Sequence, residues 1–466
     1  MEYNTETVKS IAEQFAKMIK EALNEQQQSE EGRTTIAEIE TGMREGLRQI
    51  GLQAVGILLS SLQTTPESEI ECECGGRLHY QRVRPTTVIS VFGRATYERA
   101  YYAGCSCKKG KAPLDEAYGL EPGAVTSGLG ALLALAGIEF SFESSPKWLA
   151  KYLLFEVSEN TVRSETEKMG KLQEKQEKEQ IKRSQEENYL QERQRDTGKV
   201  VTRLYGSMDA AKVRIEPRPK KGEMPEKDEE WRDMKVLSWY EVEAVPPAQR
   251  TKRHRKKVAR DQLALRAKNM RYYCDIIEAH EFGKLLWASG CAVNADKVSE
   301  LIFLGDGAAW IWKLVSYYYP TAIQIVDWYH AEEHLEKVAA SAFQEGSVRN
   351  TWLETVAQFL WEGQVEDVIC ACHSLTDVCP AAHEAVTYFT NNIDRMRYDQ
   401  FRAAAYMIGS GTIESACKQI VTHRLKVSGA QWEVPGAVQT AKARAVWLSN
   451  DWQSLCDLRA ALPLAI

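Results

Sequence analysis

The sequence lacks the features that mark membrane, secreted and fibrous proteins. Its longest uncharged apolar stretch, around Gly128 to Ile138, is much shorter than the ~20 residues that a membrane-spanning helix needs. The first ten residues, MEYNTETVKS, contain no basic segment followed by an apolar core, so no secretion signal is visible. The 11 cysteines are an odd number and stand mostly singly, which indicates reduced thiols and excludes a small disulfide-stapled module. We therefore expect a cytoplasmic protein with no membrane partner.

A strong excess of one charge is also missing, because 59 basic and 65 acidic residues leave a net charge of only −6. With 44% hydrophobic and 27% charged residues, the composition excludes collagen and a wholly disordered chain. At ~150 residues per domain, the 466 residues predict about three folding units, each with its own core. The charge is unevenly distributed, and its local extremes are the first indication of function.

Residues 1–65 predict an N-terminal helical region. Apolar residues recur at helical spacing in two stretches, and a polar run at 24–33 separates them. The simplest interpretation is a helical hairpin that serves packing or self-association.

Residues 66–125 predict a zinc-ribbon-like β module. Cys72 and Cys74 precede a glycine pair, and Cys105 and Cys107 follow TTVISVFGRATYERAYY, whose β-branched and aromatic content predicts two strands. Four thiolates can hold one tetrahedral Zn²⁺ and thereby fold a module with little core of its own. Each pair is C-x-C, tighter than the usual C-x-x-C. A structural zinc is the prediction, and a metal-free hairpin with free thiols is the alternative.

Residues 126–199 return to helical periodicity. In SPKWLAKYLLFEVSENTVRSETEKMG, an apolar helix meets a short turn and then a second helix capped by Ser158. This is a helix-turn-helix layout that places Thr161 and Arg163 near the start of the second helix, where side chains that contact DNA bases lie. An ordinary helical corner is the alternative. Charged and amide residues dominate after position 164 and predict a solvated connecting helix.

Residues 200–335 predict the first part of an α/β domain. Three β-prone runs come first, and the segments SELIFLGDGAAWIWKLVSYYY and AIQIVDWYHAEEHL then each read as strand followed by helix. Antiparallel-type strands followed by two strand-helix repeats predict a mixed sheet. Residues 336–405 contain no strong strand pattern and predict a helical insertion. Residues 406–466 predict C-terminal helices that complete the domain.

Three acidic residues stand in unusual places in this pattern. Asp209 interrupts a strand, Asp306 ends one, and Glu414 opens a helix after a Gly-Ser-Gly run. Carboxylates at the carboxyl ends of adjacent strands point into the crevice where ligands bind, and their mutual repulsion is relieved by cations. Oxygen ligands that leave waters in place suit Mg²⁺, and two such ions can act together on a phosphodiester. The joint pattern predicts a magnesium-dependent phosphodiester site.

Basic residues gather in two places. The run QRTKRHRKKVAR contains seven Lys or Arg between positions 250 and 260. Such density repels itself unless an anion neutralises it, so we expect contact with the DNA backbone, with a disordered basic linker as the alternative. A second group follows Glu414. The residues expected to contact phosphates are Lys252, Arg253, Arg255, Lys256, Lys257, Lys418, Arg424 and Lys426.

Several motifs together resemble the DDE insertion-sequence transposases, specifically the ISKra-type group. The motifs are GSMDAAKV with the downstream WRDMKV, FLGDGAAWIW, IVDWYHAEEHL, GSGTIESACKQIVTHRLKVSGAQW and, upstream, FGRATYERAYY, PLDEAYGLEPG and VSENTVRSETEKMG. The resemblance covers residues 70–450, and the long C-terminal motif is its most specific part.

The resemblance implies an RNase H-like core with a helical insertion, and an enzyme that cuts DNA and transfers strands with two Mg²⁺ ions, for which Mn²⁺ can substitute. It carries the catalytic triad onto Asp209, Asp306 and Glu414. Asp327 and His330 match a D-x-Y-H stretch of the family, with a supporting role at the site or a packing role as alternatives.

The expected partners are double-stranded DNA, as the inverted repeats of a mobile element and its target, and further copies of this chain in a dimer or larger oligomer. The expected place is the prokaryotic cytoplasm, at the nucleoid when DNA is bound. Two other functions stay open. One is a non-catalytic DNA-binding relic of a transposase, and the other is an RNase H-like nuclease without strand transfer.

Overall fold

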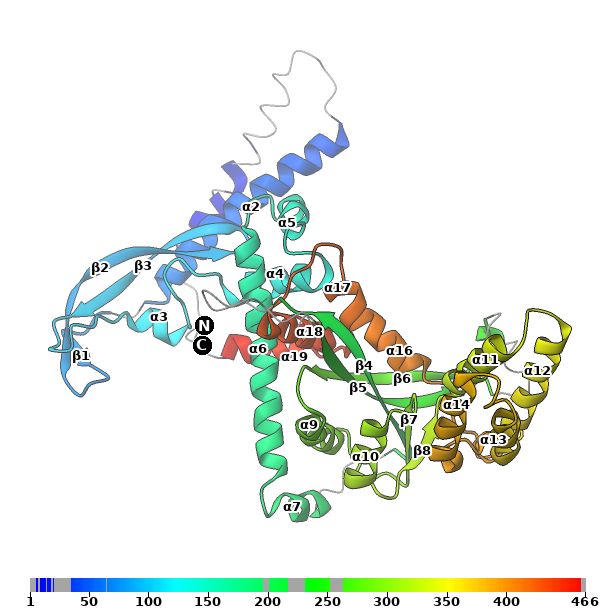
Figure 1. The fold of residues 1–466 in the computed structure, drawn as a ribbon. Coiled ribbons are helices and arrows are strands. Elements are labelled where there is room, and N and C mark those ends of the chain that lie inside the picture. The colour runs from blue at the N-terminus through cyan, green and yellow to red at the C-terminus, as the bar shows by residue number, and fades with distance from the viewer. Residues whose placement is uncertain are drawn as a thin grey trace, which may run out of the picture. The chain divides into compact units, whose positions relative to one another are not determined.

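The computed structural model describes residues 35–63, 65–195, 201–216, 231–251 and 263–461, with several positions between 6 and 20. The chain forms two compact units, one of Met1–Met169 with Trp452–Ile466 and one of Gly170–Asp451 (Figure 1). Within the described ranges, no helix combines the length and the apolar character needed to cross a membrane.

The first unit contains a three-stranded antiparallel sheet in the order β1-β2-β3. Its strands are β1 (Glu69–Glu71), β2 (Arg77–Ser90) and β3 (Gly93–Ala103). The hairpin between β2 and β3 turns at Gly93, whose φ of +113° is readily adopted only by glycine. Helix α2 packs against β3, because its apolar side chains cover the half of the hairpin next to this turn.

Helices complete the first unit, and they are α2 (Ile36–Ser61), α3 (Pro113–Ala117), α4 (Ser127–Glu139), α5 (Ser145–Leu153), the start of α6 (Glu159–Ser184) and α19 (Trp452–Ala461). A left-handed residue, Leu154, ends α5, and the Ser158 hydroxyl then caps α6 by accepting the Thr161 amide at 3.1 Å. The predicted helix, turn and capped second helix are present. Helix α19 packs against α4 although it comes last in the sequence.

The second unit contains a five-stranded mixed sheet in the order β6-β5-β4-β7-β8. Its strands are β4 (Arg203–Arg214), β5 (Trp231–Ala244), β6 (Leu265–Asp275), β7 (Glu300–Gly305) and β8 (Ile323–Val326). The central strand β4 runs antiparallel to β5 and parallel to β7. The predicted fold class is therefore confirmed: an N-terminal helix, a small β module bearing four cysteines, and a mixed α/β sheet with many helices.

The helices of the second unit surround this sheet (Figure 1). They are α7 (Tyr189–Arg195), α9 (Ala279–Ala292), α10 (Ala309–Tyr318), α11 (Trp328–Ala342), α12 (Ser347–Trp361), α13 (Val365–His373), α14 (Pro380–Asn391), α15 (Tyr398–Ala403), α16 (Gly411–Cys417), α17 (His423–Leu425) and α18 (Val434–Leu448). A π-helical stretch, Lys418–Thr422, joins α16 to α17. Between β8 and α16 the described chain is entirely helical or loop, as the helical insertion at 336–405 requires.

The helical insertion shares its core with the sheet. Phe389 on α14 and Tyr398 on α15 are fully buried in the same cluster as Trp239 on β5 and Phe303 on β7. Burying aromatic side chains of this size contributes several kcal/mol in total, at about 25 cal/mol per Å² of apolar surface. The insertion is thereby held against the carboxyl ends of β7 and β8.

Candidate active site and metal centre

The sheet register brings two of the predicted acids together. Strands β4 and β7 pair in parallel, and the last paired residues are Ser207 and Leu304. The offset of 97 residues between these partners equals the separation of Asp209 from Asp306. Asp209 lies two residues after Ser207, and Asp306 lies two residues after Leu304. The two acidic residues therefore stand at the same level along the β4–β7 pairing. Burial raises the pKa of Asp209, and the negative charge of Asp306 raises it further.

Each oxygen of the Asp209 carboxylate has one partner. Oδ1 accepts the Ala210 amide at 2.6 Å, and Oδ2 accepts the thiol of Cys417 at 3.4 Å. Cys417 is buried on α16, which packs against β4 and β5. Sequence analysis did not identify Cys417. Its position one helical turn after Glu414 was a usable signal, because residues three apart lie on neighbouring parts of a helix face.

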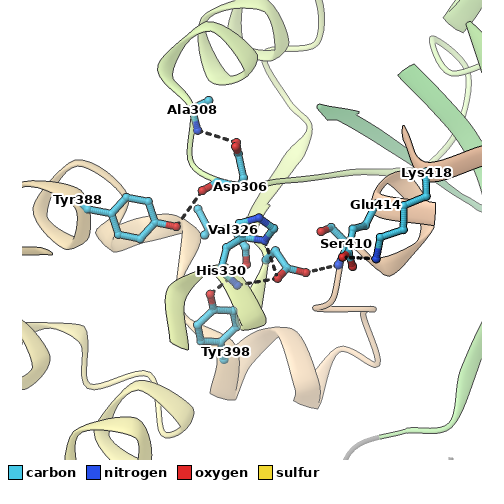
Figure 2. Close-up of polar contacts among 10 residues, drawn as sticks. Asp306, Ala308, Val326, His330, Tyr388, Tyr398, Ser410, Glu414 and Lys418 are labelled. Carbon is cyan, nitrogen blue, oxygen red and sulfur yellow. Dashed lines mark hydrogen bonds and ion pairs between the residues drawn. The ribbon is translucent and has the colours of Figure 1, made fainter. Parts of the chain in front are cut away.

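Asp306 stands in a tight turn between β7 and α10 (Figure 2). Its Oδ1 accepts the Ala308 amide at 2.9 Å, and its backbone carbonyl accepts the hydroxyl of Tyr388 at 2.9 Å. Gly307 makes this turn possible with a φ of +99°. Within the described part of the chain, Oδ2 of Asp306 has no hydrogen bond or ion pair, so this oxygen is available to a ligand.

Asp327 is buried and both of its carboxylate oxygens are used inside the protein. Oδ1 accepts the His330 amide at 2.9 Å and lies 3.2 Å from His330 Nδ1, while Oδ2 accepts the Ser410 amide. A backbone bond from Trp328 to Ile408 at 2.9 Å adds to this link. Asp327 therefore joins the start of α11 to the loop that precedes α16.

The Asp327 and His330 side chains stabilise each other's charge. Burial opposes ionisation of Asp327, but the hydrogen bonds from His330 and Ser410 outweigh it and lower the pKa of the carboxyl. The hydrogen bond that the His330 ring donates to Asp327 raises the pKa of His330 to about 9, with a smaller contribution from the charge of Asp306. His330 is consequently an imidazolium at neutral pH, close to the acids of β4 and β7.

Glu414 is placed differently from the two aspartates. Its side chain is 57% exposed in the first turn of α16, and its carboxylate pairs with the Lys418 ammonium at 2.8 Å (Figure 2). Among the described residues, the cysteine cluster alone brings three or more metal-ligating atoms within 4.8 Å of one another. The structure thus unites Asp209 with Asp306 and leaves Glu414 paired with Lys418.

The predicted DNA-contacting residues fall into three groups. Lys418 and Lys426 are exposed near α16, whereas Arg424 is 2% exposed and its guanidinium lies 5.0 Å from the centre of the Trp432 ring. In the helix-turn-helix, Arg163 is exposed and pairs with Glu159 at 3.0 Å, and Thr161 is half-buried. The third group lies outside the described residues and comprises Lys252, Arg253, Arg255, Lys256 and Lys257.

The four predicted zinc ligands converge in the first unit. Cys72 and Cys74 lie in the turn between β1 and β2, and Cys105 and Cys107 follow β3. All four sulfur atoms lie within 4.8 Å of one another, with 3.2 Å between those of Cys74 and Cys105. A tetrahedral site with Zn–S bonds of about 2.3 Å requires sulfur atoms about 3.8 Å apart. The cluster could hold a structural zinc ion, as predicted.

Two cysteines of this cluster have pKa values shifted in opposite directions. The Cys107 amide and the Cys74 thiol lower the pKa of Cys105 to about 6, because they donate hydrogen bonds to its thiolate. The Cys74 amide also lowers the pKa of Cys72, but side-chain hydrogen bonds with Cys74 and Cys107 outweigh it and raise that pKa to about 12. Hydrogen bonding among the thiols thus shifts the pKa of Cys105 and the pKa of Cys72 in opposite directions.

The sequence matches no model of a protein family, and no curated protein matches it.

Proposed function

We propose that this chain is a DDE-type DNA transposase whose second unit cuts and joins phosphodiester bonds. The observation that carries the proposal is the register of β4 and β7, which sets Asp209, within the central strand β4, level with Asp306, just beyond the carboxyl end of its parallel neighbour β7. The strand order, antiparallel on one side of β4 and parallel on the other, supports an RNase H-like core. The quoted motifs support the ISKra-type group of insertion sequences.

Asp209 and Asp306, which we call the acid pair, supply two of the three carboxylates expected for a Mg²⁺ site. Asp209 and Asp306 offer hard oxygen ligands, and the pKa of Asp209 is raised by burial and by the negative charge of Asp306, a repulsion that a cation relieves. Asp209 would contact both ions and Asp306 one of them, while Glu414 would exchange Lys418 for the second. Bound there, two Mg²⁺ or Mn²⁺ ions would activate the attacking oxygen and stabilise the leaving oxygen.

DNA binding is proposed for both units. The zinc-ribbon-like module and the exposed Arg163 in the first unit would hold the ends of the mobile element. In the second unit, Lys418 and Lys426 are exposed near the acids and would contact phosphates, whereas Arg424 is buried and contributes to packing. Assembly of two or more copies on DNA would bring both element ends to one target.

The ion pair between Glu414 and Lys418 favours a second candidate. If Glu414 remained on Lys418, the site would keep only two acidic ligands, and the chain would bind DNA without cutting it. This second candidate is a non-catalytic transposase relic. Nicking of DNA in the presence of a divalent cation separates the two functions.

Asp209→Asn is the central test of the proposal. It keeps the shape of the side chain and removes the charge that would hold the ions, so folding and DNA binding should survive. Nicking of a supercoiled plasmid that carries the coding sequence with its flanking DNA should fall by several orders of magnitude, because catalysis here depends on the ions. Asp306→Asn should behave alike, and the double variant should lose little more, as expected for groups acting as one unit.

Two controls sharpen this test. Asp233→Asn removes an exposed carboxylate from β5 of the same sheet, where it faces Lys212 at 3.4 Å, and should leave nicking unchanged. Nicking should fall less in Asp327→Asn than in Asp209→Asn, because the Asp327 carboxylate is almost fully buried and already paired with His330. Nicking at the wild-type rate by Asp209→Asn would refute the proposal.

A further inference from the structure

A tyrosine from the helical insertion reaches the turn that carries Asp306. Tyr388 lies on α14, and its hydroxyl donates to the backbone carbonyl of Asp306 at 2.9 Å (Figure 2). Strand β7 ends at Gly305, so this carbonyl has no ladder partner in the sheet. The Tyr388 hydroxyl therefore gives the Asp306 carbonyl the hydrogen bond that a neighbouring strand would give it within the sheet. This bond is important because a carbonyl shielded from water without a partner destabilises the fold.

The ring of Tyr388 is held on two sides. On one side it packs against Gly307, where an added Cβ would lie 2.5 Å from Tyr388 Cε2. On the other side it stacks on the His334 ring of α11, with centroids 3.8 Å apart and planes inclined by 20°. Burial raises the pKa of Tyr388, and nearby negative charges including that of Asp306 raise it further. The hydroxyl therefore stays protonated and remains a donor at all working pH values.

The same insertion also contacts the next strand end. Tyr398 on α15 is fully buried and donates to the Val326 carbonyl, the last residue of β8, at 3.0 Å (Figure 2). Tyr388 thus binds the carbonyl of Asp306, directly after β7. Tyr398 binds the last carbonyl of β8, directly before Asp327. Of these two tyrosines, however, it is Tyr388 that bonds to Asp306, the residue whose negative charge raises the pKa of Asp209.

We propose that Tyr388 is a positioning residue for Asp306, through which the helical insertion fixes the carboxylate for metal binding. The inference rests on the proposed function, in which Asp306 is a metal ligand. The Ala308 amide directs Oδ1 from one side of the turn, and Tyr388 holds the backbone from the other. These two bonds together fix the orientation of the Asp306 carboxylate, and its Oδ2 stays available to a metal ion. Groups that orient a metal ligand in this way typically change affinity 10–100-fold when removed.

Tyr388→Phe tests the inference because it keeps the ring against Gly307 and His334 and removes only the hydroxyl. Mn²⁺ is the probe, and the loss of the free Mn²⁺ signal in electron paramagnetic resonance measures its binding without any DNA. We expect the dissociation constant for Mn²⁺ to rise about tenfold. The matched control is Tyr406→Phe, which removes a hydroxyl bonded to Glu300 at 3.1 Å, at the opposite end of β7, and should leave Mn²⁺ affinity unchanged.

A double variant separates positioning from general destabilisation. In the Asp306→Asn background the ligand is already lost, so adding Tyr388→Phe should weaken Mn²⁺ binding no further. An equal loss in both backgrounds would overturn the inference, since Tyr388 would then act through something other than Asp306. Wild-type affinity in Tyr388→Phe, with affinity lost in Asp209→Asn, would overturn the inference alone. Mn²⁺ binding that survives Asp209→Asn would overturn the proposed function and this inference with it.

Discussion

A charged pair lies beside the acid pair, and it shows how single residues support the site. Asp327 and His330 stand three residues apart on α11, and their contact keeps one a carboxylate and the other an imidazolium. Because Asp327 also accepts the Ser410 amide, the pair connects β8 to the loop before Glu414. These contacts suit structural support of the site better than metal binding, since the Asp327 side chain is only 2% exposed and its charge is already neutralised by His330.

The raised pKa of His330 predicts a pH-dependent contribution to stability. The folded-state pKa of His330, about 9, lies above the ordinary histidine value of 6.5, so the stabilisation is complete below pH 6.5. It declines as pH rises toward 9 and is absent above it. The side chain is 39% exposed, and solvent screening reduces the effect to on the order of 1 kcal/mol. The difference in melting temperature between wild type and His330→Gln should therefore shrink from pH 6 to pH 10.

His334 offers a matched control one turn further along α11. Burial lowers its pKa, so folding favours the neutral ring and the sign is reversed. Relative to His334→Gln, the wild type should gain stability as pH rises through 6.5. A His330→Gln difference that stays constant from pH 6 to pH 10 would contradict the assigned charge state.

At the scale of elements, the second unit depends on one close helix crossing. Helices α6 and α18 meet at Gly170, where an added Cβ would overlap the backbone carbonyl of Gln439. Further along the same pair of helices, the buried Lys442 ammonium pairs with Glu177 and, at 2.8 Å, with Asp275 at the end of β6. The crossing therefore connects α6, α18 and the edge of the sheet, and only glycine permits the approach.

Gly170→Ala should destabilise the protein by about 1–3 kcal/mol, the usual cost of overpacking, because backbone atoms rather than a flexible side chain stand in the way. Thermal unfolding measures the change. Gly42→Ala is the control, since Gly42 lies in the middle of α2 with no atom within 4 Å of an added Cβ. That variant should gain about 0.5–1 kcal/mol from helix propensity. Equal effects of the two substitutions would mean that the crossing is not close-packed.

At the scale of the whole molecule, the two units differ in how their cores are built. The open end of the hairpin in the first unit, opposite the turn at Gly93, has a small core that consists of Cys72, Leu78, Ala100, Tyr102 and Cys105. The second unit has one large aromatic and aliphatic core shared by sheet and helices. We therefore expect the small core, with thiols at its centre, to depend on a metal ion and the large core to fold without one.

Zinc removal should therefore affect the two units unequally. Purified protein should contain about one zinc per chain, and Cys105→Ser should release it and unfold the open end of the hairpin while the second unit stays folded. Zinc content by atomic absorption and amide spectra by NMR measure the two outcomes. Cys370→Ser, at an exposed cysteine of α13, should keep the zinc. Metal-free wild-type protein in which the open end of the hairpin is intact would contradict the zinc assignment.

The sequence by itself determined the local features and their order. Alternating β-prone residues and the paired cysteines predicted the hairpin and its thiol cluster, and the order of strands and helices predicted the mixed sheet. The spacing of Asp209 and Asp306 also agreed with the strand register, because parallel neighbours in a sheet share one offset along their length. These features depend on residues close in sequence or on a single pairing.

Only the tertiary structure decided which side chains complete the site. Tyr388 is 82 residues from Asp306, and Cys417 is 208 residues from Asp209. No periodicity encodes such contacts, since they depend on how the helical insertion and α16 pack against the strand ends. Packing around α17 also decided that Arg424 is buried, with its guanidinium beside the Trp432 ring. A spacing along the chain predicts which residues share an element, whereas packing between elements selects the atoms that meet.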